Sequence, residues 1–191
     1  SEYNLEFEQE LKPVQYENTI EVPFCPESSL SGIENKEFLS GMTYQRDITI
    51  PSDWEDRNIH LNCGAVFYKC AVYVNGKLAG CHTGGNVSFT IDLTGYAEPG
   101  KTHSLSVVVK NNLWDDNQPS GKQSKTYNSY GCLYTRTTGI WQTIWLEGVD
   151  SRGLKNIYAV PDLFSKSLIL TPRFHSVKKG QTLRVQVLDE G

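Results

Sequence analysis

Thr138-Gly139-Ile140-Trp141-Gln142-Thr143-Ile144-Trp145-Leu146-Glu147 is the stretch that best indicates the fold, because two tryptophans and several β-branched residues follow a glycine. With the side-chain period of two that a strand has, Trp141, Thr143, Trp145 and Glu147 share one face, and Gln142, Ile144 and Leu146 share the other. Apolar side chains therefore occur on both faces. The stretch predicts a strand that is buried on both sides, inside a β-sandwich and not at an edge.

Strand-like segments of similar length recur along the chain. The clearest turn between them is Asn75-Gly76, since both residues tolerate the positive φ of a type I′ hairpin. Helical periodicity never persists for a dozen residues, so the strand–helix alternation that builds a catalytic barrel is absent. The pattern predicts an all-β, two-sheet sandwich. Its expected strands are 19–22, 42–50, 58–62, 66–74, 87–91, 103–110 and 141–146.

A polar linker at residues 149–153 precedes three further strand-like segments, 154–160, 168–173 and 183–188. Three strands with one apolar face are marginal by themselves. We therefore expect a first domain over residues 1–150. Residues 151–191 are expected to be the truncated start of a second domain, or else strands that pack back on the first sandwich. Because the chain begins at Ser1 without a Met, we expect it to be processed or cut from something longer.

The charge balance, 18 Lys and Arg against 22 Asp and Glu, gives a net charge of −4 without a basic run. It argues against nucleic acid and an anionic membrane surface as partners. Five cysteines with no Cys-x-x-Cys pair indicate neither a zinc site nor a complete disulfide framework, so packed, reduced thiols are expected. The alternative is one disulfide in an exported protein. No cofactor fingerprint occurs. The compartment stays open between cytoplasm and periplasm, and the odd number of cysteines favours the cytoplasm.

The longest irregular segment, residues 111–138, separates the last two predicted strands of the first domain. Loops of this length usually serve function or are disordered. It carries carboxylates, amides and a lysine close to Trp114, which are the acceptors, donors and stacking plane that a sugar requires. The alternative is a solvated loop whose Asp and Asn side chains form turns.

Glu27, His82 and the four tryptophans are weaker candidates. A glycosidase needs two carboxyl groups in one cleft, and the sequence supplies no partner for Glu27, so a structural role is expected. His82 precedes a glycine pair with no second His at metal-ligand spacing, and we expect it to pack over a turn. Trp141 and Trp145 are expected in the core, and Trp54 and Trp114 at the surface.

Several motifs occur in a fixed order between residues 19 and 150. They are Val22-Pro23-Phe24-Cys25-Pro26-Glu27-Ser28 with Leu30-Ser31-Gly32-Ile33, then Tyr44-Gln45-Arg46, then Val72-Tyr73-Val74-Asn75-Gly76-Lys77 with Gly80, His82, Gly84 and Gly85, and finally the stretch 138–147. As a set they resemble the N-terminal sugar-binding domain of glycoside hydrolase family 2, which includes β-galactosidases, β-glucuronidases and β-mannosidases. The usual opening of that domain, Asn-Gly-x-Trp, is not visible at residues 3–7.

The resemblance implies a jelly-roll β-sandwich of the galactose-binding-domain-like type, followed by an immunoglobulin-like domain. It implies that the Asp-rich loop reaches the mouth of a downstream catalytic barrel and helps to hold the sugar. The residues that match the pattern of that loop are Asp115, Asp116, Gln118, Lys122 and Gln123. The family hydrolyses β-linked sugars with retention through two Glu on the barrel, and nothing in this chain matches either.

We therefore expect the non-catalytic front end of a retaining β-galactosidase-like or β-glucuronidase-like enzyme. Its expected partners are a carbohydrate of the β-galactoside or β-glucuronide class and the remaining domains of the parent enzyme. Two alternatives stay open. An independent carbohydrate-binding module would show exposed aromatic residues in a line on one sheet, and a purely structural sandwich would use the loop to contact another chain.

Overall fold

The computed structural model describes residue 16 and residues 18–188. The chain divides into two compact units, Ser1–Gly148 and Val149–Gly191. The described residues contain strands and two three-residue 3-10 turns but no α-helix, and none of their helical segments is long and apolar enough to cross a membrane. The expectation about residues 3–7 lies outside the described part of the chain.

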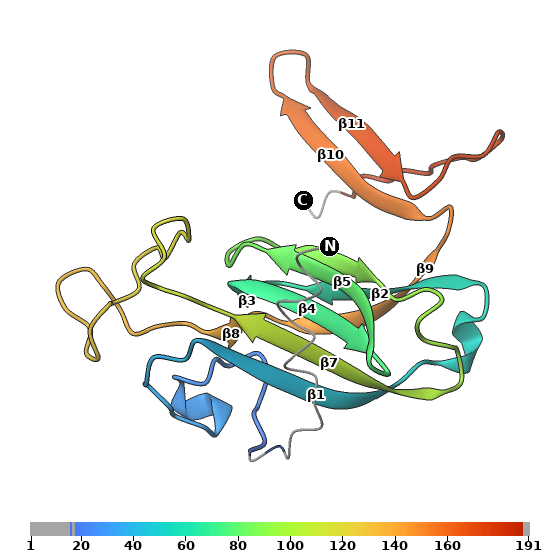
Figure 1. The fold of residues 1–191 in the computed structure, drawn as a ribbon. Coiled ribbons are helices and arrows are strands. Elements are labelled where there is room, and N and C mark those ends of the chain that lie inside the picture. The colour runs from blue at the N-terminus through green and yellow to red at the C-terminus, as the bar shows by residue number, and fades with distance from the viewer. Residues whose placement is uncertain (1–15, 17, 189–191) are drawn as a thin grey trace. The chain divides into compact units, whose positions relative to one another are not determined.

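Antiparallel strands build the first unit, as Figure 1 shows. One sheet has four strands in the order β1-β7-β4-β5, a second has three in the order β6-β2-β9, and β3 pairs with β8 alone. The bounds are β1 (Gly41–Thr49), β2 (Arg57–Cys63), β3 (Val66–Phe67), β4 (Lys69–Val74), β5 (Lys77–Thr83), β6 (Phe89–Asp92), β7 (Thr102–Lys110), β8 (Gly139–Ile140) and β9 (Ile144–Asp150). The two 3-10 turns are η1 (Ser29–Ser31) and η2 (Ser52–Trp54).

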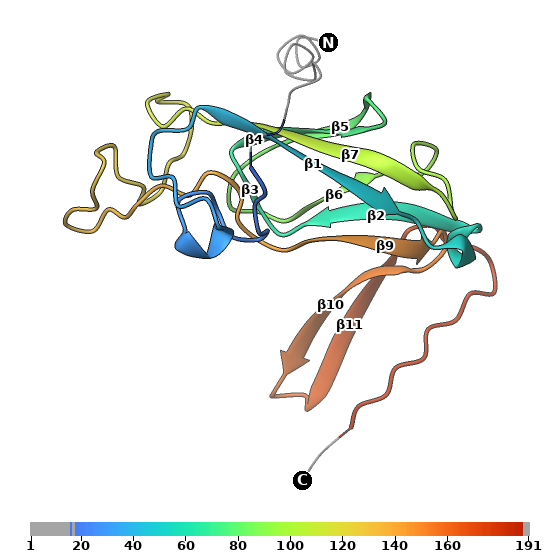
Figure 2. The same cartoon turned by 90° about the horizontal axis from the view of Figure 1, so that it is seen from below.

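The two larger sheets face each other as the layers of a sandwich, which Figure 2 shows from the side. Val72 and Val107 from the four-stranded sheet and Leu61 and Ile91 from the three-stranded sheet belong to one buried cluster. On β2 every second residue is buried, as expected for a strand with one solvated face. The all-β sandwich predicted from the sequence is confirmed.

The strand that is buried on both faces is β4, not the stretch 138–147. Residues Cys70–Val74 of β4 are all buried, with Ala71 and Tyr73 packed in a second cluster on the outer side. The neighbouring strand β5 supplies Leu78 to this outer cluster. A central strand with covered faces thus exists, but it contains no tryptophan, and the turn motif Asn75-Gly76 follows it.

The prediction of one interior strand over residues 138–147 is wrong. The stretch forms β8 and β9 in different sheets, and in the described chain β9 is the last strand of its sheet. Gly139 has a φ of 74°, a region that side chains disfavour. Residues 141–143 between the two strands belong to neither sheet. Because the chain changes partners there, the alternation of the two faces is broken, and Trp145 is 46% exposed.

The other predicted strands agree with the structure only in part. The Asn75-Gly76 hairpin is confirmed, with φ values of 49° and 77° between β4 and β5. The predicted strand 66–74 is interrupted at Tyr68 and forms β3 and β4. Residues 19–22 and 183–188 are not strands in the structure. Neither segment pairs with another strand within the described residues. The Glu21 N–H donates instead to the Ser31 carbonyl oxygen at 2.9 Å.

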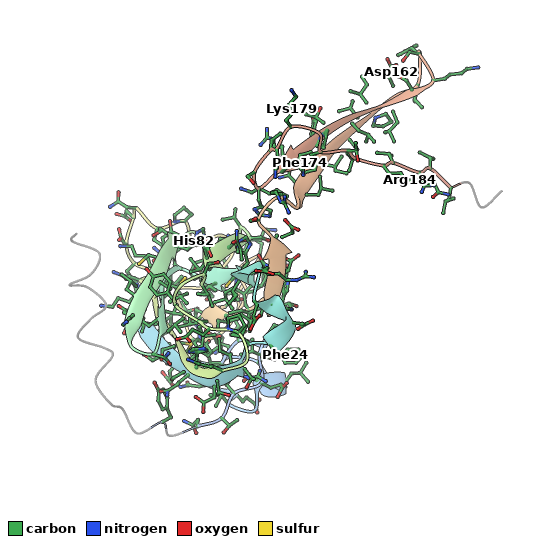
Figure 3. The ribbon with its side chains drawn as sticks, turned by 90° about the vertical axis from the view of Figure 1, so that its right-hand side faces the viewer. Phe24, His82, Asp162, Phe174, Lys179 and Arg184 are labelled. Carbon is green, nitrogen blue, oxygen red and sulfur yellow. The ribbon has the colours of Figure 1, made fainter. Side chains whose placement is uncertain are left out.

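The described residues of the second unit form one hairpin, β10 (Leu154–Asp162) paired antiparallel with β11 (Ser167–Phe174). Asp162 and Phe174 mark its two ends in Figure 3. None of the described residues of this unit is buried. Its apolar side chains, including Ile157, Val160 and Ile169, stay exposed, so the hairpin has no hydrophobic core of its own.

Candidate functional site: the loop between β7 and β8

The loop of residues 111–138, from here on the 111–138 loop, joins β7 to β8. In Figures 1 and 2 it extends, in yellow and gold, from one end of the sandwich, and the blue segment 24–40 lies beside it. Hydrogen bonds from Arg136 to Lys36 and from Thr138 to Glu27 connect the two segments. This end of the first unit is therefore built from both.

Arg136, near the end of the loop, is almost completely buried, with 2% of its surface exposed. Its Nη1 donates to the carbonyl oxygens of Thr126, at 2.6 Å, and Tyr127, at 2.9 Å. Its Nη2 donates to the carbonyl oxygen of Lys36. One guanidinium thus connects the outer part of the loop, the end of the loop and the segment before β1. Within the described residues, no ion pair between Arg136 and a carboxylate is found.

The Arg136 guanidinium also lies against aromatic rings. Its Cζ is 4.4 Å from the ring centroid of Phe38 and 5.9 Å from that of Tyr127, within the range of cation–π attraction. Phe38 in turn meets Trp114, with ring centroids 4.9 Å apart. We refer to Trp114, Phe38, Arg136 and Tyr127 as the aromatic cluster. Trp114 is 55% and Tyr127 50% exposed, so its two outer rings offer aromatic surface to solvent.

Glu27, the weak acid–base candidate, is buried. Its Oε2 accepts a hydrogen bond of 3.2 Å from the backbone N–H of Thr138. Burial, and to a smaller extent the Glu27 carboxylate, raise the pKa of the neighbouring Cys25 thiol to about 11. A buried carboxylate that accepts from a backbone amide ties the two segments together, which agrees with the structural role expected for Glu27.

Two of the five predicted sugar-binding residues hold the loop in shape. The buried Gln118 accepts from the backbone N–H of Asn112 at 3.0 Å and donates to Oδ1 of Asn111 at 2.7 Å. The partly buried Gln123 accepts from the backbone N–H of Thr137 at 2.7 Å. Because the polar groups of both amides are engaged by the loop itself, Gln118 and Gln123 act as internal supports of its backbone.

The other three predicted residues, Asp115, Asp116 and Lys122, are exposed. Asp115 Oδ1 accepts from the backbone N–H of Asn117 at 2.9 Å, which is the local turn that the alternative interpretation anticipated. No side-chain hydrogen bond involving Asp116 or Lys122 is found in the described part of the chain. These three charged groups remain accessible to a ligand.

Two hollows border the loop. The first, about 330 Å³ in volume and called here the Trp114 hollow, is lined by residues that include Phe38, Leu39, Asn111, Asn112, Trp114 and Arg136. The second, about 200 Å³ and called the Lys122 hollow, is lined by residues that include Phe67, Asn86, Lys122, Gln123, Tyr134 and Trp141. The second combines a cation, two amides and three aromatic rings.

The two hollows are lined by alternate residues of 135–137, the last part of the loop before β8. Arg136 lines the Trp114 hollow, whereas its neighbours Thr135 and Thr137 line the Lys122 hollow. The structure therefore does not gather the five predicted residues into one cluster: Lys122 and Gln123 line one hollow, and Asp115 and Asp116 follow Trp114 of the other.

The remaining candidates are structural. His82, labelled in Figure 3, stacks on Phe89 with centroids 3.9 Å apart, and its Nε2 lies 3.1 Å from the Gly84 carbonyl oxygen. It packs over the turn, as expected. Among residue 16 and residues 18–188, no group of three or more His, Cys, Asp or Glu is arranged to hold a metal ion.

The tryptophans divide differently from the prediction. Trp114 is exposed, as expected, and Trp141 is partly buried, with its Nε1 donating to the Gly85 carbonyl at 2.8 Å. The expectations for the other two were wrong. Trp54 packs on the core, where a Cβ at Gly148 would meet its indole at 2.4 Å. Trp145 points outward because it lies on the solvated face of β9.

The comparison with known protein families identifies a family whose domain agrees with the observed β-sandwich. Residues 2–146 match the family described as glycosyl hydrolases family 2, sugar binding domain. The chain belongs to this family, as its N-terminal sugar-binding domain, and its relatives are glycoside hydrolases. One relative, a β-galactosidase of Thermoanaerobacter pseudethanolicus, is 24% identical over 65% of this chain. Another, a putative β-glucuronidase of Formosa agariphila, is 30% identical over 62% of it.

Solved structures agree on the fold. A β-glucuronidase from Ruminococcus gnavus superposes on 94% of this chain with a TM-score of 0.68 and 18% identity. One from Faecalibacterium prausnitzii superposes on 86% with a TM-score of 0.66 and 20% identity. The chain spans only part of these proteins: 16% of the Thermoanaerobacter relative, 13% of the Formosa relative and 32% of both solved chains.

Sequence reasoning missed Arg136 and Phe38. Arg136 belongs to no cluster of charged or amide residues, and Phe38 lies between the predicted strands 19–22 and 42–50. The only signal was Arg136 itself, a single cation between threonines just before a run of apolar residues. A charged residue in that context is either exposed or buried with several acceptors, and only the fold could show that it is buried.

Proposed function

We propose that this chain is the non-catalytic carbohydrate-binding front end of a retaining β-glycosidase, and that the 111–138 loop is the part that contacts the sugar. The observation that supports this most directly is the combination of a supported backbone and accessible charges. Gln118, Gln123 and Arg136 hold the loop from inside, while Asp115, Asp116 and Lys122 stay exposed at its surface. Preorganised polar groups bind a ligand without the cost of ordering the loop.

The Lys122 hollow is the part of the loop that suits a sugar best. Lys122 and the Asn86 amide can donate to hydroxyl or carboxylate oxygens. Tyr134, which is 62% exposed, and Trp141 supply aromatic surface for the apolar face of a pyranose ring. The ligand class we propose is a β-galactoside or β-glucuronide, the classes that the names of the relatives specify for those proteins.

The independent binding module is the weaker alternative. In the described part of the first unit, Trp145 is the one large aromatic residue of a strand that is strongly exposed, and the other exposed aromatic residues lie in loops and turns. A line of aromatic platforms on one sheet is therefore missing from the described strands. The arrangement favours a domain whose binding groups sit at one end of the sandwich, where another domain can complete the site.

For the second unit we propose the first strands of an immunoglobulin-like domain. The support is the separate compact unit, Val149–Gly191, and the exposed apolar residues on β10 and β11. A hairpin with uncovered apolar side chains needs further strands to bury them. The boundary expected from the sequence, between residues 150 and 151, differs by two residues from the division into compact units.

The test is a titration of the ¹⁵N-labelled chain with methyl β-galactoside and methyl β-glucuronide, followed by NMR. We expect a dissociation constant of millimolar order, because a few exposed hydrogen bonds contribute about 1 kcal/mol each. The shifts should centre on residues 115–123 and on Tyr134. Shifts confined to the sheets, or none in the loop at saturating sugar, would contradict the proposal. Micromolar binding of a monosaccharide would favour the independent module.

The same preparation tests the non-catalytic part of the proposal. Retaining hydrolysis needs two carboxyl groups about 5 Å apart in one cleft, and Glu27 is buried against Thr138 with no access to a substrate. Chromogenic β-glycosides should therefore not be turned over. Turnover that persists through repurification and is abolished by Glu27→Ala or Asp115→Ala would refute it.

A further inference from the structure

We infer that Arg136 is the positioning residue of the 111–138 loop: its buried guanidinium sets the shape of the loop that presents the sugar-binding groups. The inference rests on the proposed function for the meaning of that shape, but the shape itself can be measured without a sugar. The Arg136 side chain is almost completely buried. It acts through the backbone of Thr126, Tyr127 and Lys36, whose carbonyl oxygens accept its hydrogen bonds.

The geometry of these contacts requires a guanidinium. The acceptors lie on two separate segments, 126–127 and 36, and two different nitrogens of the side chain reach them. The planar guanidinium presents donors in a rigid fork, whereas a lysine ammonium is a compact point charge on a flexible stem. Lysine would keep the charge but not the simultaneous contact with both segments.

Burial explains why the side chain has a role beyond stability. Removing a cation from water without a carboxylate partner is costly, and an apolar residue of similar size often serves stability as well. Arg136 is 2% exposed, and in the described part of the chain its Nε has no hydrogen-bond partner. A costly, incompletely satisfied cation at the centre of a loop is best explained by the connection it makes.

That connection fixes the aromatic cluster and separates the two hollows. Phe38 lies between Arg136 and Trp114, so the position of the exposed indole depends on the guanidinium behind Phe38. The neighbouring residues Thr135 and Thr137 line the Lys122 hollow. If Arg136 loses its acceptors, residues 135–137 are released, and both hollows change together.

Amide hydrogen exchange of the full chain is the direct test. Across the loop, the Ser124 N–H donates to the Tyr134 carbonyl oxygen, and the Tyr134 N–H donates to the Lys122 carbonyl oxygen. In Arg136→Lys and Arg136→Met we expect the amides of Ser124 and Tyr134 to exchange at least tenfold faster than in the wild type. Amides of β4, such as Val72, report global unfolding and should change much less. Phe38→Leu, which keeps the guanidinium and its carbonyl acceptors, should accelerate the loop amides by a smaller factor.

The matched control is Arg57→Lys. Arg57 also donates to a carbonyl, that of Gly148 at 3.0 Å, but it is exposed, and its acceptor belongs to β9 and not to the loop. Its replacement should leave the exchange of Ser124 and Tyr134 unchanged. If Arg136→Lys and Arg136→Met exchange at the wild-type rate in the loop, or accelerate β4 and the loop equally, Arg136 is only a stabilising residue and the inference is wrong.

The sugar titration separates this inference from the proposed function. If the wild type shows sugar-dependent shifts, Arg136→Lys should reduce the affinity at least fivefold, while Arg57→Lys keeps it. If the wild type shows no shifts but the loop amides of Arg136→Lys exchange faster, the positioning role stands and the sugar-binding proposal fails. If the loop opens in Arg136→Lys and the affinity is unchanged, the loop shape has no bearing on binding, and the inference about its purpose is overturned.

Discussion

The carboxylate of Glu27 accepts a hydrogen bond of 3.2 Å from the backbone N–H of Thr138, although the two residues are 111 positions apart in the sequence. Thr138 is the last residue of the 111–138 loop, and Glu27 belongs to the segment before β1. Both are buried. Together with the bonds of Arg136, this contact anchors the returning end of the loop where it enters β8.

Glu27→Ala should lower the free energy of unfolding by about 1–3 kcal/mol, because it leaves the buried Thr138 amide without its acceptor. Glu27→Gln keeps an acceptor oxygen at the same place and should cost markedly less. Urea denaturation of both variants measures the difference. Equal losses in the two variants would mean that the charge of Glu27, and not its hydrogen bond, is what the fold uses.

Gln118→Ala should lower stability and Asp116→Ala should lower sugar affinity, although both residues were predicted as sugar-binding from one motif. Gln118 is buried and bonded to Asn111 and Asn112, so its removal should cost about 1–3 kcal/mol of stability. Asp116 is exposed, and its removal should change stability by less than about 0.5 kcal/mol while weakening sugar binding. Thermal melts and the sugar titration check both. A strongly destabilised Asp116→Ala would make that carboxylate structural.

The cysteines should react with a thiol reagent in a fixed order. Cys132 is exposed, whereas Cys63 and Cys70 are buried. Cys25 is partly accessible, but its pKa of about 11 leaves about one thiolate in a thousand at pH 8. Mass spectrometry after limited alkylation at pH 8 should find the label on Cys132 first, and Cys132→Ser should remove the rapid phase. Rapid labelling of Cys63 would contradict the packing of the core.

Alkaline pH should destabilise the first unit. Burial raises the pKa of the Cys63 thiol from 9.0 to about 12, and that of Cys25 to about 11. Above pH 9 the unfolded chain releases protons that the folded chain keeps, so the free energy of unfolding falls as the pH rises from about 9 toward 12. Denaturation at several pH values should show this slope, and Cys63→Ala should make it shallower. A flat profile would show that the thiols are not buried.

Local signals sufficed for part of the fold. The hairpin was predictable because Asn75 and Gly76 are chosen by the positive φ of the turn itself. The strands near residues 42–50 and 103–110 were predictable because every second side chain, such as Leu105, Val107 and Val109, packs in the core. The 111–138 loop was recognisable by its length and polarity.

The errors arose where distant contacts decide. A period-two pattern cannot show that residues 138–147 change sheets, since the position of Gly139 depends on Tyr44 and Met42, against which a Cβ would collide. Residue type alone could not separate Gln118 from Asp116, because both are polar and only the fold determines which is buried. The buried position of Arg136 could not be predicted because its acceptors are backbone carbonyls, which every residue has.

The hairpin of the second unit should be the least protected part of the described strands. Residues 154–174 contain no buried side chain, and an isolated two-stranded hairpin is marginal in water. We expect the backbone amides of β10 and β11 to exchange at least a hundredfold faster than those of β4 and β7, whose residues are largely buried. Hydrogen exchange read by NMR gives both rates in one sample.

Ile157→Thr should leave the melting temperature of the first unit unchanged, whereas Val72→Thr, in the core of that unit, should lower it by several degrees. Strong protection of β10 and β11 would mean that other residues cover their apolar side chains, and the proposal of an incomplete immunoglobulin-like domain would be wrong.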